Sequence, residues 1–178
     1  MNLFRISDDP AITASQLADR HVRKMVLEGA QILSTAVRLN VEENPDMFGP
    51  YSGRIILDIQ KQLYRVAHRH HPVTLYATSK TGALDVLRHS KALFAEYRHR
   101  WNKIHASESV ILQASIYLSF FPEWETGSGC PTAPLCVDED LRTLSDYDAY
   151  RAHLDRKYNE WKRPPVWTRR ERPEWVTR

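Results

Sequence analysis

Five polar residues could do chemistry together on one face of a predicted helix. They are His21, Lys24, Glu28, Gln31 and Thr35, each three or four residues from the next. This spacing aligns side chains along an α-helix. A carboxylate among an imidazole, an ammonium and an amide could act as acid or base while its neighbours hold a phosphate or a base edge. The polar face of any amphipathic helix would look similar, with Lys24 and Glu28 as an ordinary ion pair.

A second group of candidate residues lies between His70 and Lys80. His71 and Thr74 could contact a phosphate, and a histidine can also exchange a proton near neutral pH. Lys80 follows Ser79 at a predicted helix N-terminus, where phosphates commonly bind. The alternative is a solvated loop rich in His and Arg. Neither a metal-ligand spacing nor a common nucleotide-binding or hydrolase motif occurs in the chain, so we expect no metal and no other cofactor.

The C-terminal residues 163–178 are predicted to form an irregular, extended tail that is basic and aromatic. Its candidate phosphate contacts are Arg163, Arg169 and Arg170. Arginines neutralise phosphates and tryptophans stack on bases. Alternatively, tryptophans beside prolines clamp the chain end onto the core. We expect Trp161 in the core, and Trp167 or Trp175 partly exposed.

Charge is segregated along the chain, although its 25 Lys or Arg and 22 Asp or Glu leave a net charge of only +3. Residues 54–103 have ten bases and three acids, and residues 151–178 have nine bases and four acids. Residues 122–148 have seven acids and one base. Segregated basic segments favour a polyanionic partner, for which we predict double-stranded DNA. Solvated helix faces would give the same totals.

The elements that must position these residues are predicted to be helices. The first begins at Asp9-Pro10 or at Thr13 and continues to about Arg38, because apolar residues recur there at the helical period. The later predictions are a loop at 40–53, a short helix (less favourably a strand) at 54–67, an extended or irregular segment at 73–77, a helix from Ser79 or Thr81 to about Lys103, a helix at 107–120, a loop at 123–134, and a helix from Asp138 or Ser145 to Trp161. The helix at 107–120 is the most hydrophobic and is expected to be the most buried.

The chain is therefore predicted to be mainly α, a single domain over residues 1–178 with four or five helices in a bundle. Cys130 and Cys136 are too few for a disulfide framework and are expected to be reduced. The N-terminus has no signal-peptide pattern, and no segment reaches the roughly 18 apolar residues that span a bilayer. We expect a cytoplasmic protein without a membrane partner, with a monomer favoured.

Residues 17–28, LADRHVRKMVLE, resemble the first helix of the pyrimidine-dimer DNA glycosylases, the endonuclease V-like family of T-even phages. That helix also has Leu-Ala-Asp-x-His and a glutamate nine residues after the aspartate, as Glu28 is after Asp19 here. The segments HPVTLYATSK and LFAEYRHR are similar in character to the family's His-Val-Thr segment and the helix behind it. The resemblance implies a DNA repair enzyme in which Glu28 is the catalytic glutamate and His21 the histidine on the phosphate side.

A resemblance over nearly the full length is to phage proteins that have no assigned activity. The shared pattern appears here as Asp9-Pro10, His21-Val22, Lys24-Met25, Glu28, His71-Pro72, Thr74, Ala149-Tyr150-Arg151, Trp161-Lys162-Arg163 and Pro173-Glu174-Trp175.

Two parts of the glycosylase mechanism are not matched. The family's nucleophile is an N-terminal amine, exposed when Met is removed before a small residue, but Asn2 predicts that Met1 is retained. Leu27 and Gln31 stand where the family has two arginines. We therefore expect an enzyme that excises or modifies a damaged or modified DNA base, with Glu28 as acid/base group. The unmatched nucleophile argues against lyase activity. The alternatives are a non-catalytic DNA-binding or phage–host interaction protein on this scaffold, and an enzyme acting on free nucleotides.

Overall fold

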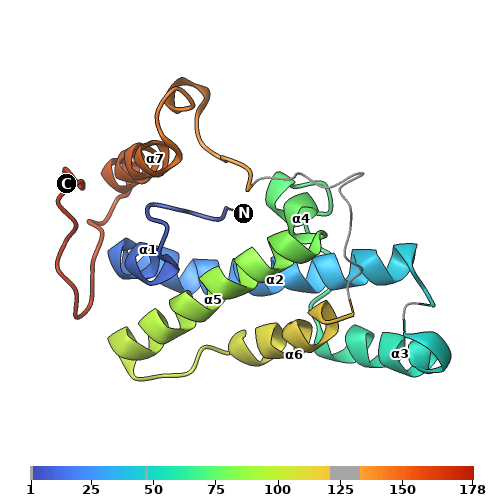
Figure 1. Ribbon diagram of the computed structural model, residues 1–178. Coiled ribbons are helices and arrows are strands. Elements are labelled where there is room, and N and C mark those ends of the chain that lie inside the picture. The colour runs from blue at the N-terminus through green and yellow to red at the C-terminus, as the bar shows by residue number, and fades with distance from the viewer. Residues whose placement is uncertain (1, 47, 121–132) are drawn as a thin grey trace.

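The computed structural model describes residues 2–46, 48–120 and 133–178, and this part of the chain is helical without a strand (Figure 1). The α-helices are α1 (Pro10–Gln16), α2 (Asp19–Glu43), α3 (Ser52–Gln62), α4 (Pro72–Ala77), α5 (Lys80–Trp101), α6 (Glu108–Leu118) and α7 (Asp146–Glu160). Two 3₁₀ turns, Gly49–Tyr51 and Glu139–Leu141, complete the described elements. The mainly α prediction is confirmed.

Helix α2 is the centre of the fold. It packs against α4, α5 and α6, and α1 packs against α5. Figure 1 shows α5 crossing α2, with α3 and α6 on one side and α7 with the C-terminal segment on the other. One cluster of buried apolar side chains extends from Leu3 in the N-terminal segment to Val176 near the C-terminus. None of the described helices combines the length and apolar character that crossing a membrane requires.

The predicted first helix is in fact two helices. Leu17 and Ala18 are extended and fully buried between α1 and α2. The Ala18 N–H donates to the Tyr158 hydroxyl (3.1 Å), and the Asp19 N–H donates to the Val166 carbonyl (2.8 Å). Residues far along the chain therefore accept hydrogen bonds from backbone N–H groups that a continuous helix would have satisfied internally. The prediction of one continuous helix was wrong here.

Helix α2 also continues past its predicted end at Arg38, so the predicted loop at 40–53 was wrong for its first residues. Asn40 is buried in α2, and its Nδ2 donates to the carbonyls of Ala36 and Thr78, both at 3.0 Å. The two hydrogen bonds from Nδ2 hold the extra turn against α4, whereas the Asn40 Oδ1 is buried without a hydrogen-bond partner among the described residues. The favoured helical prediction for 54–67 is confirmed by α3 up to Gln62, whereas residues 63–67 are not helical and that part of the prediction was wrong.

Helix α4 replaces the extended segment predicted at 73–77. Pro72 occupies its first position, where a missing N–H costs nothing. His71 caps the helix, because its Nδ1 accepts the Val73 N–H at 3.2 Å. The His71-Pro72 pair begins a helix, so the prediction of an extended or irregular segment at 73–77 was wrong.

Serine caps at the starts of α5 and α7 are confirmed. Ser79 accepts from the Gly82 N–H at 3.0 Å, and Ser145 accepts from the Asp148 N–H at 3.3 Å. The corner between α4 and α5 is tight, because a Cβ at position 82 would overlap the Tyr76 carbonyl oxygen. Glycine is therefore required where the chain turns from His71 into α5.

Helix α6 is only half buried, contrary to the prediction that it is the most enclosed. Ile111 and Ala114 are fully buried, whereas Leu112 and Ile116 are 49% and 55% exposed. An apolar composition raised the expected burial, but only one face of the helix packs against other described residues. Most of the loop predicted at 123–134, including Cys130, lies outside the described residues, and Cys136 is half-buried.

The C-terminal segment is clamped onto the core. The Trp167 Nε1 donates to the Gln16 carbonyl (2.9 Å), and the Trp175 Nε1 donates to the Gln16 side chain (2.8 Å). Trp167 is buried, whereas Trp161 and Trp175 are half-buried. The clamping alternative therefore describes these tryptophans, Trp175 is partly exposed as expected, and the prediction of Trp161 inside the core was wrong.

Candidate functional site

Glu28 presents a carboxylate at the boundary between the core and solvent. The residue is 7% exposed and lies in α2. Its Oε2 accepts the Asn2 backbone N–H at 3.2 Å, and its Oε1 is 3.2 Å from the Nζ of Lys24, whose side chain is 60% exposed. The predicted ion pair is thus confirmed, and the carboxylate also anchors the N-terminal segment.

The N-terminal segment is held between α2 and α7. The Asn2 Nδ2 donates to the Cys136 carbonyl at 2.8 Å. Phe4 meets the edge of Tyr150, with ring centroids 5.9 Å apart, and Ile6 is fully buried. These contacts fix the direction of the backbone nitrogen of residue 2 toward Glu28.

The charge of Glu28 acts on His71, although more weakly than burial does. Burial lowers the pKa of His71, and the Glu28 carboxylate acts in the opposite sense. Because Nδ1 accepts the Val73 N–H, the neutral imidazole carries its proton on Nε2. The neutral ring therefore keeps one N–H donor for a ligand. Glu28, Lys24 and His71 form the first part of the candidate site.

His21 is enclosed by aromatic rings and separate from that carboxylate. It is 6% exposed, its Nδ1 is 3.2 Å from the Tyr158 hydroxyl, and its ring packs against Phe4 and Trp161, each with centroids 5.1 Å away. Burial, assisted by the charges of Lys157 and Lys24, lowers the pKa of His21 to about 3. A neutral, enclosed imidazole favours positioning of Trp161 over contact with phosphate.

The remaining predicted residues of the first helix and of α4 have separate places. Thr35 both donates to and accepts from the backbone of Ala67, so it holds the segment after α3. Gln31 is half-buried in α2. Thr74 is fully buried, and its hydroxyl has no hydrogen-bond partner among the described residues. Lys80 is half-buried at the first position of α5.

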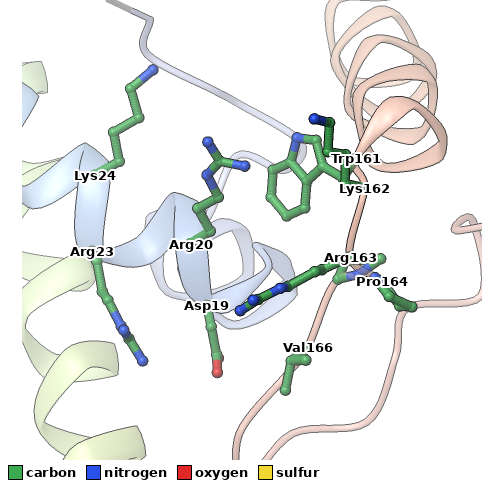
Figure 2. Close-up of a pocket in the computed structure, with 10 residues that line it drawn as sticks. Asp19, Arg20, Arg23, Lys24, Trp161, Lys162, Arg163, Pro164 and Val166 are labelled. Carbon is green, nitrogen blue, oxygen red and sulfur yellow. The ribbon is translucent and has the colours of Figure 1, made fainter.

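A hollow of about 830 Å³ adjoins Lys24 and forms the second part of the candidate site (Figure 2). Its walls come from the first turns of α2 and from the segment that follows α7. The lining residues are Asp19, Arg20, Arg23, Lys24, Trp161, Lys162, Arg163, Pro164, Pro165 and Val166. We call this hollow the cationic pocket. Arg163, a predicted phosphate contact, is among its residues, and Lys24 belongs to both parts.

A buried charge cluster fixes the position of the C-terminal segment, and the sequence did not reveal it. Arg100 is fully buried and donates to Glu96 (2.6 Å) and Asp19 (2.8 Å). Thr168 donates to Asp19 through both its N–H (3.0 Å) and its hydroxyl (2.7 Å). The only local signal was the spacing of Glu96 and Arg100, four residues apart on one helix.

Two of the predicted phosphate-binding arginines have partners within the protein. Arg170 donates twice to the Glu96 carboxylate, at 3.0 and 2.8 Å. Burial would raise the pKa of Glu96, but the hydrogen bonds from Arg170 and Arg100 outweigh it and hold that pKa below its ordinary value. Arg169 donates to the His99 carbonyl at 2.8 Å. These contacts favour structural roles for Arg169 and Arg170.

Comparison with protein-family models found no match, and comparisons with curated proteins and with solved structures found none either. The described residues also contain no group of three or more His, Cys, Asp or Glu placed to hold a metal ion. The interpretation of the site therefore depends on its own geometry and on the sequence resemblance.

Proposed function

We propose that this protein acts on a base of DNA, by excision or modification, with Glu28 as the acid/base group. The observation that carries the proposal is the buried Glu28 carboxylate, which pairs with Lys24 at the edge of the cationic pocket and whose charge acts on His71. A carboxylate at such a boundary can reach a ligand while the core limits its hydration. The resemblance of residues 17–28 to pyrimidine-dimer DNA glycosylases gives the same residue the same role.

The chemistry of base excision suits this arrangement. Breaking the bond between C1′ of the sugar and the base leaves positive charge on the sugar, which a nearby carboxylate stabilises. Glu28 can also accept the proton that an attacking water releases. His71 can donate from Nε2 to the departing base or to a phosphate. The target base must first leave the stack, and basic and aromatic groups on the protein surface support that step.

The backbone nitrogen of residue 2 bears on which form of the reaction occurs. It already lies 3.2 Å from Glu28, so a chain beginning at Asn2 would present an amine there. A chain that retains Met1 has only an amide at this position, and water becomes the nucleophile. Intact mass of the purified protein and borohydride trapping on DNA separate the two forms. We expect Met1 to be retained and no trapped adduct.

Glu28→Gln tests the proposal on duplexes that carry damaged or phage-type modified bases. We expect excision or modification to fall about 100-fold or more, the usual scale for losing an acid/base group. Folding and DNA affinity should persist, because glutamine keeps the shape and removes a negative charge near phosphates. Glu43→Gln, exposed at the far end of the same helix, is the matched control.

Other outcomes contradict the proposal in distinct ways. Full turnover by Glu28→Gln would reject Glu28 as the catalytic residue. Salt-sensitive DNA binding without turnover on any duplex would identify a non-catalytic DNA-binding protein. Turnover confined to free nucleotides would replace DNA as the substrate.

A further inference from the structure

Two arginines in the first turns of α2 have their guanidinium groups over tryptophan rings. The Arg20 guanidinium is 5.0 Å from the centroid of Trp161, and the Arg23 guanidinium is 4.6 Å from that of Trp101. Figure 2 shows Arg20 beside the Trp161 indole and Arg163 extending from the C-terminal segment toward α2. A guanidinium placed over an aromatic ring is oriented by that ring, and its N–H groups stay available to donate to a ligand. The donors of the pocket are therefore arranged before any ligand arrives.

The positive charge of the cationic pocket is not neutralised within the described protein. The side chains of Arg20, Arg23, Lys162 and Arg163 form no ion pair or hydrogen bond with any described residue. The carboxylate in the lining, Asp19, is already bonded to Arg100 and Thr168, and Lys24 is paired with Glu28. Four unpaired cations around one hollow repel each other, so the arrangement favours binding of an anion with several oxygen acceptors.

The segment after α7 also gives the pocket apolar surface. Pro164, Pro165 and Val166 line the pocket beyond Lys162 and Arg163. The volume of about 830 Å³ lies within the range of pockets that enclose small ligands, which a flat basic surface does not offer. A ligand that fits both the cationic and the apolar surface has phosphate at one end and a less polar ring at the other.

We infer that the cationic pocket binds one nucleotide unit, with its phosphate on Arg20, Arg23 and Arg163 and its sugar or base against Pro164–Val166. This inference rests on the proposed function in one respect: the nucleotide unit belongs to a DNA strand, and the neighbouring nucleoside of that strand reaches Glu28. Lys24 connects the two places, because it lines the pocket and pairs with Glu28. A free nucleotide offers the same chemistry, and the experiment separates the two sources.

The test is calorimetric titration of the wild type and two double variants with four probes. The probes are inorganic pyrophosphate, a deoxynucleoside, its triphosphate and a short oligonucleotide. Arg20→Gln/Arg23→Gln removes the stacked donors, and Arg88→Gln/Lys91→Gln removes the same charge from an exposed face of α5. We expect the first variant to bind the phosphorylated probes at least about tenfold more weakly than the wild type, which is the scale of one charge-assisted hydrogen bond. The control variant should lose less than about threefold in affinity. The wild type should bind the deoxynucleoside much more weakly than its triphosphate.

The outcomes separate the possible ligands. An oligonucleotide bound more tightly than the triphosphate supports a DNA strand, and the reverse order supports a free nucleotide. Equal losses in the two double variants, or a deoxynucleoside bound as tightly as the triphosphate, would overturn the nucleotide pocket. If the pocket variant fails to fold, Arg163→Gln, on an exposed extended segment, has the same expectation for direction.

Glu28→Gln separates this inference from the proposed function, because we expect it to lose turnover and keep pocket binding. Glu28-dependent turnover without nucleotide affinity in the pocket would overturn the inference alone. Pocket binding without Glu28-dependent turnover would overturn the proposed function alone.

Discussion

Residues of the candidate site have different roles, although they lie on one helix face: some are placed to contact a ligand, and others pack within the protein. Glu28 and Lys24 contact each other at the surface boundary, whereas His21 lies under Trp161. Their three- and four-residue spacing is the same, so helical periodicity alone could not separate them. Their contacts separate them, because Glu28 pairs with the exposed Lys24 side chain, whereas the aromatic rings of Phe4 and Trp161 pack against His21.

His21 should make the free energy of unfolding depend on pH. Its folded pKa of about 3 lies below the ordinary 6.5, so the unfolded chain binds the proton more readily. Stability is therefore complete above about pH 6.5 and falls as the pH drops toward 3, by at most about 1.4 kcal/mol per pH unit for this group. His89, His71, His105 and His153 shift in the same direction and add to the loss.

The measurement is urea unfolding of the wild type and His21→Phe between pH 7.5 and pH 4. The variant should have a shallower dependence, because phenylalanine keeps the ring and removes the titrating nitrogen. His99→Phe, on an exposed histidine, is the control. Parallel curves for the wild type and His21→Phe would contradict burial of a neutral imidazole.

At the scale of elements, the corner between α4 and α5 positions His71 for the site. A Cβ at position 82 would overlap the Tyr76 backbone, whereas a Cβ at position 53 in α3 would have nothing within 4 Å. Gly82→Ala should destabilise the protein by more than about 1 kcal/mol, because backbone must move. Gly53→Ala should stabilise it by up to about 1 kcal/mol, the difference in helix propensity. Thermal unfolding of both variants checks the contrast, and equal effects would contradict the tight corner.

Elements with local signals were predicted, and those decided by distant contacts were not. Ser79 and Ser145 were recognisable caps because a serine side chain satisfies nearby backbone donors. The break at Leu17 and Ala18 has no local cause, since its hydrogen-bond partners include Tyr158, 140 residues away from Ala18. Local sequence was ambiguous at Pro72, which is compatible with either a break or the first turn of a helix.

The candidate site was predictable to the same extent. The pair Lys24 and Glu28 follows from spacing within one helix. The cationic pocket does not, because it forms only where the segment after α7 passes α2. Arg170 was expected to bind phosphate for its charge, but Glu96 occupies its donors. A basic residue far along the chain from its acidic partner looks unpaired in sequence.

At the scale of the whole molecule, the segregated charges overstate the surface available to DNA. Arg100 and Arg170 are bonded to the buried Glu96 carboxylate, although each was counted in a basic segment. Unpaired cations gather instead around the cationic pocket, at Arg20, Arg23 and Arg163. Duplex binding should therefore depend on fewer phosphate contacts than the basic segments suggest, with the pocket among them.

The salt dependence of duplex binding measures that footprint. Each neutralised phosphate contributes about −0.9 to the slope of log affinity against log salt concentration. Arg20→Gln/Arg23→Gln should therefore make the slope less negative by roughly 1, because both arginines are placed on the same phosphate. Arg88→Gln/Lys91→Gln should leave it nearly unchanged, since those side chains project from an exposed face of α5. Fluorescence anisotropy from about 50 to 300 mM salt gives both slopes on the same duplex. Binding that ignores salt, or equal slope changes in the two variants, would remove the pocket from the DNA contact surface, and no binding at about 50 mM would argue against a DNA partner altogether.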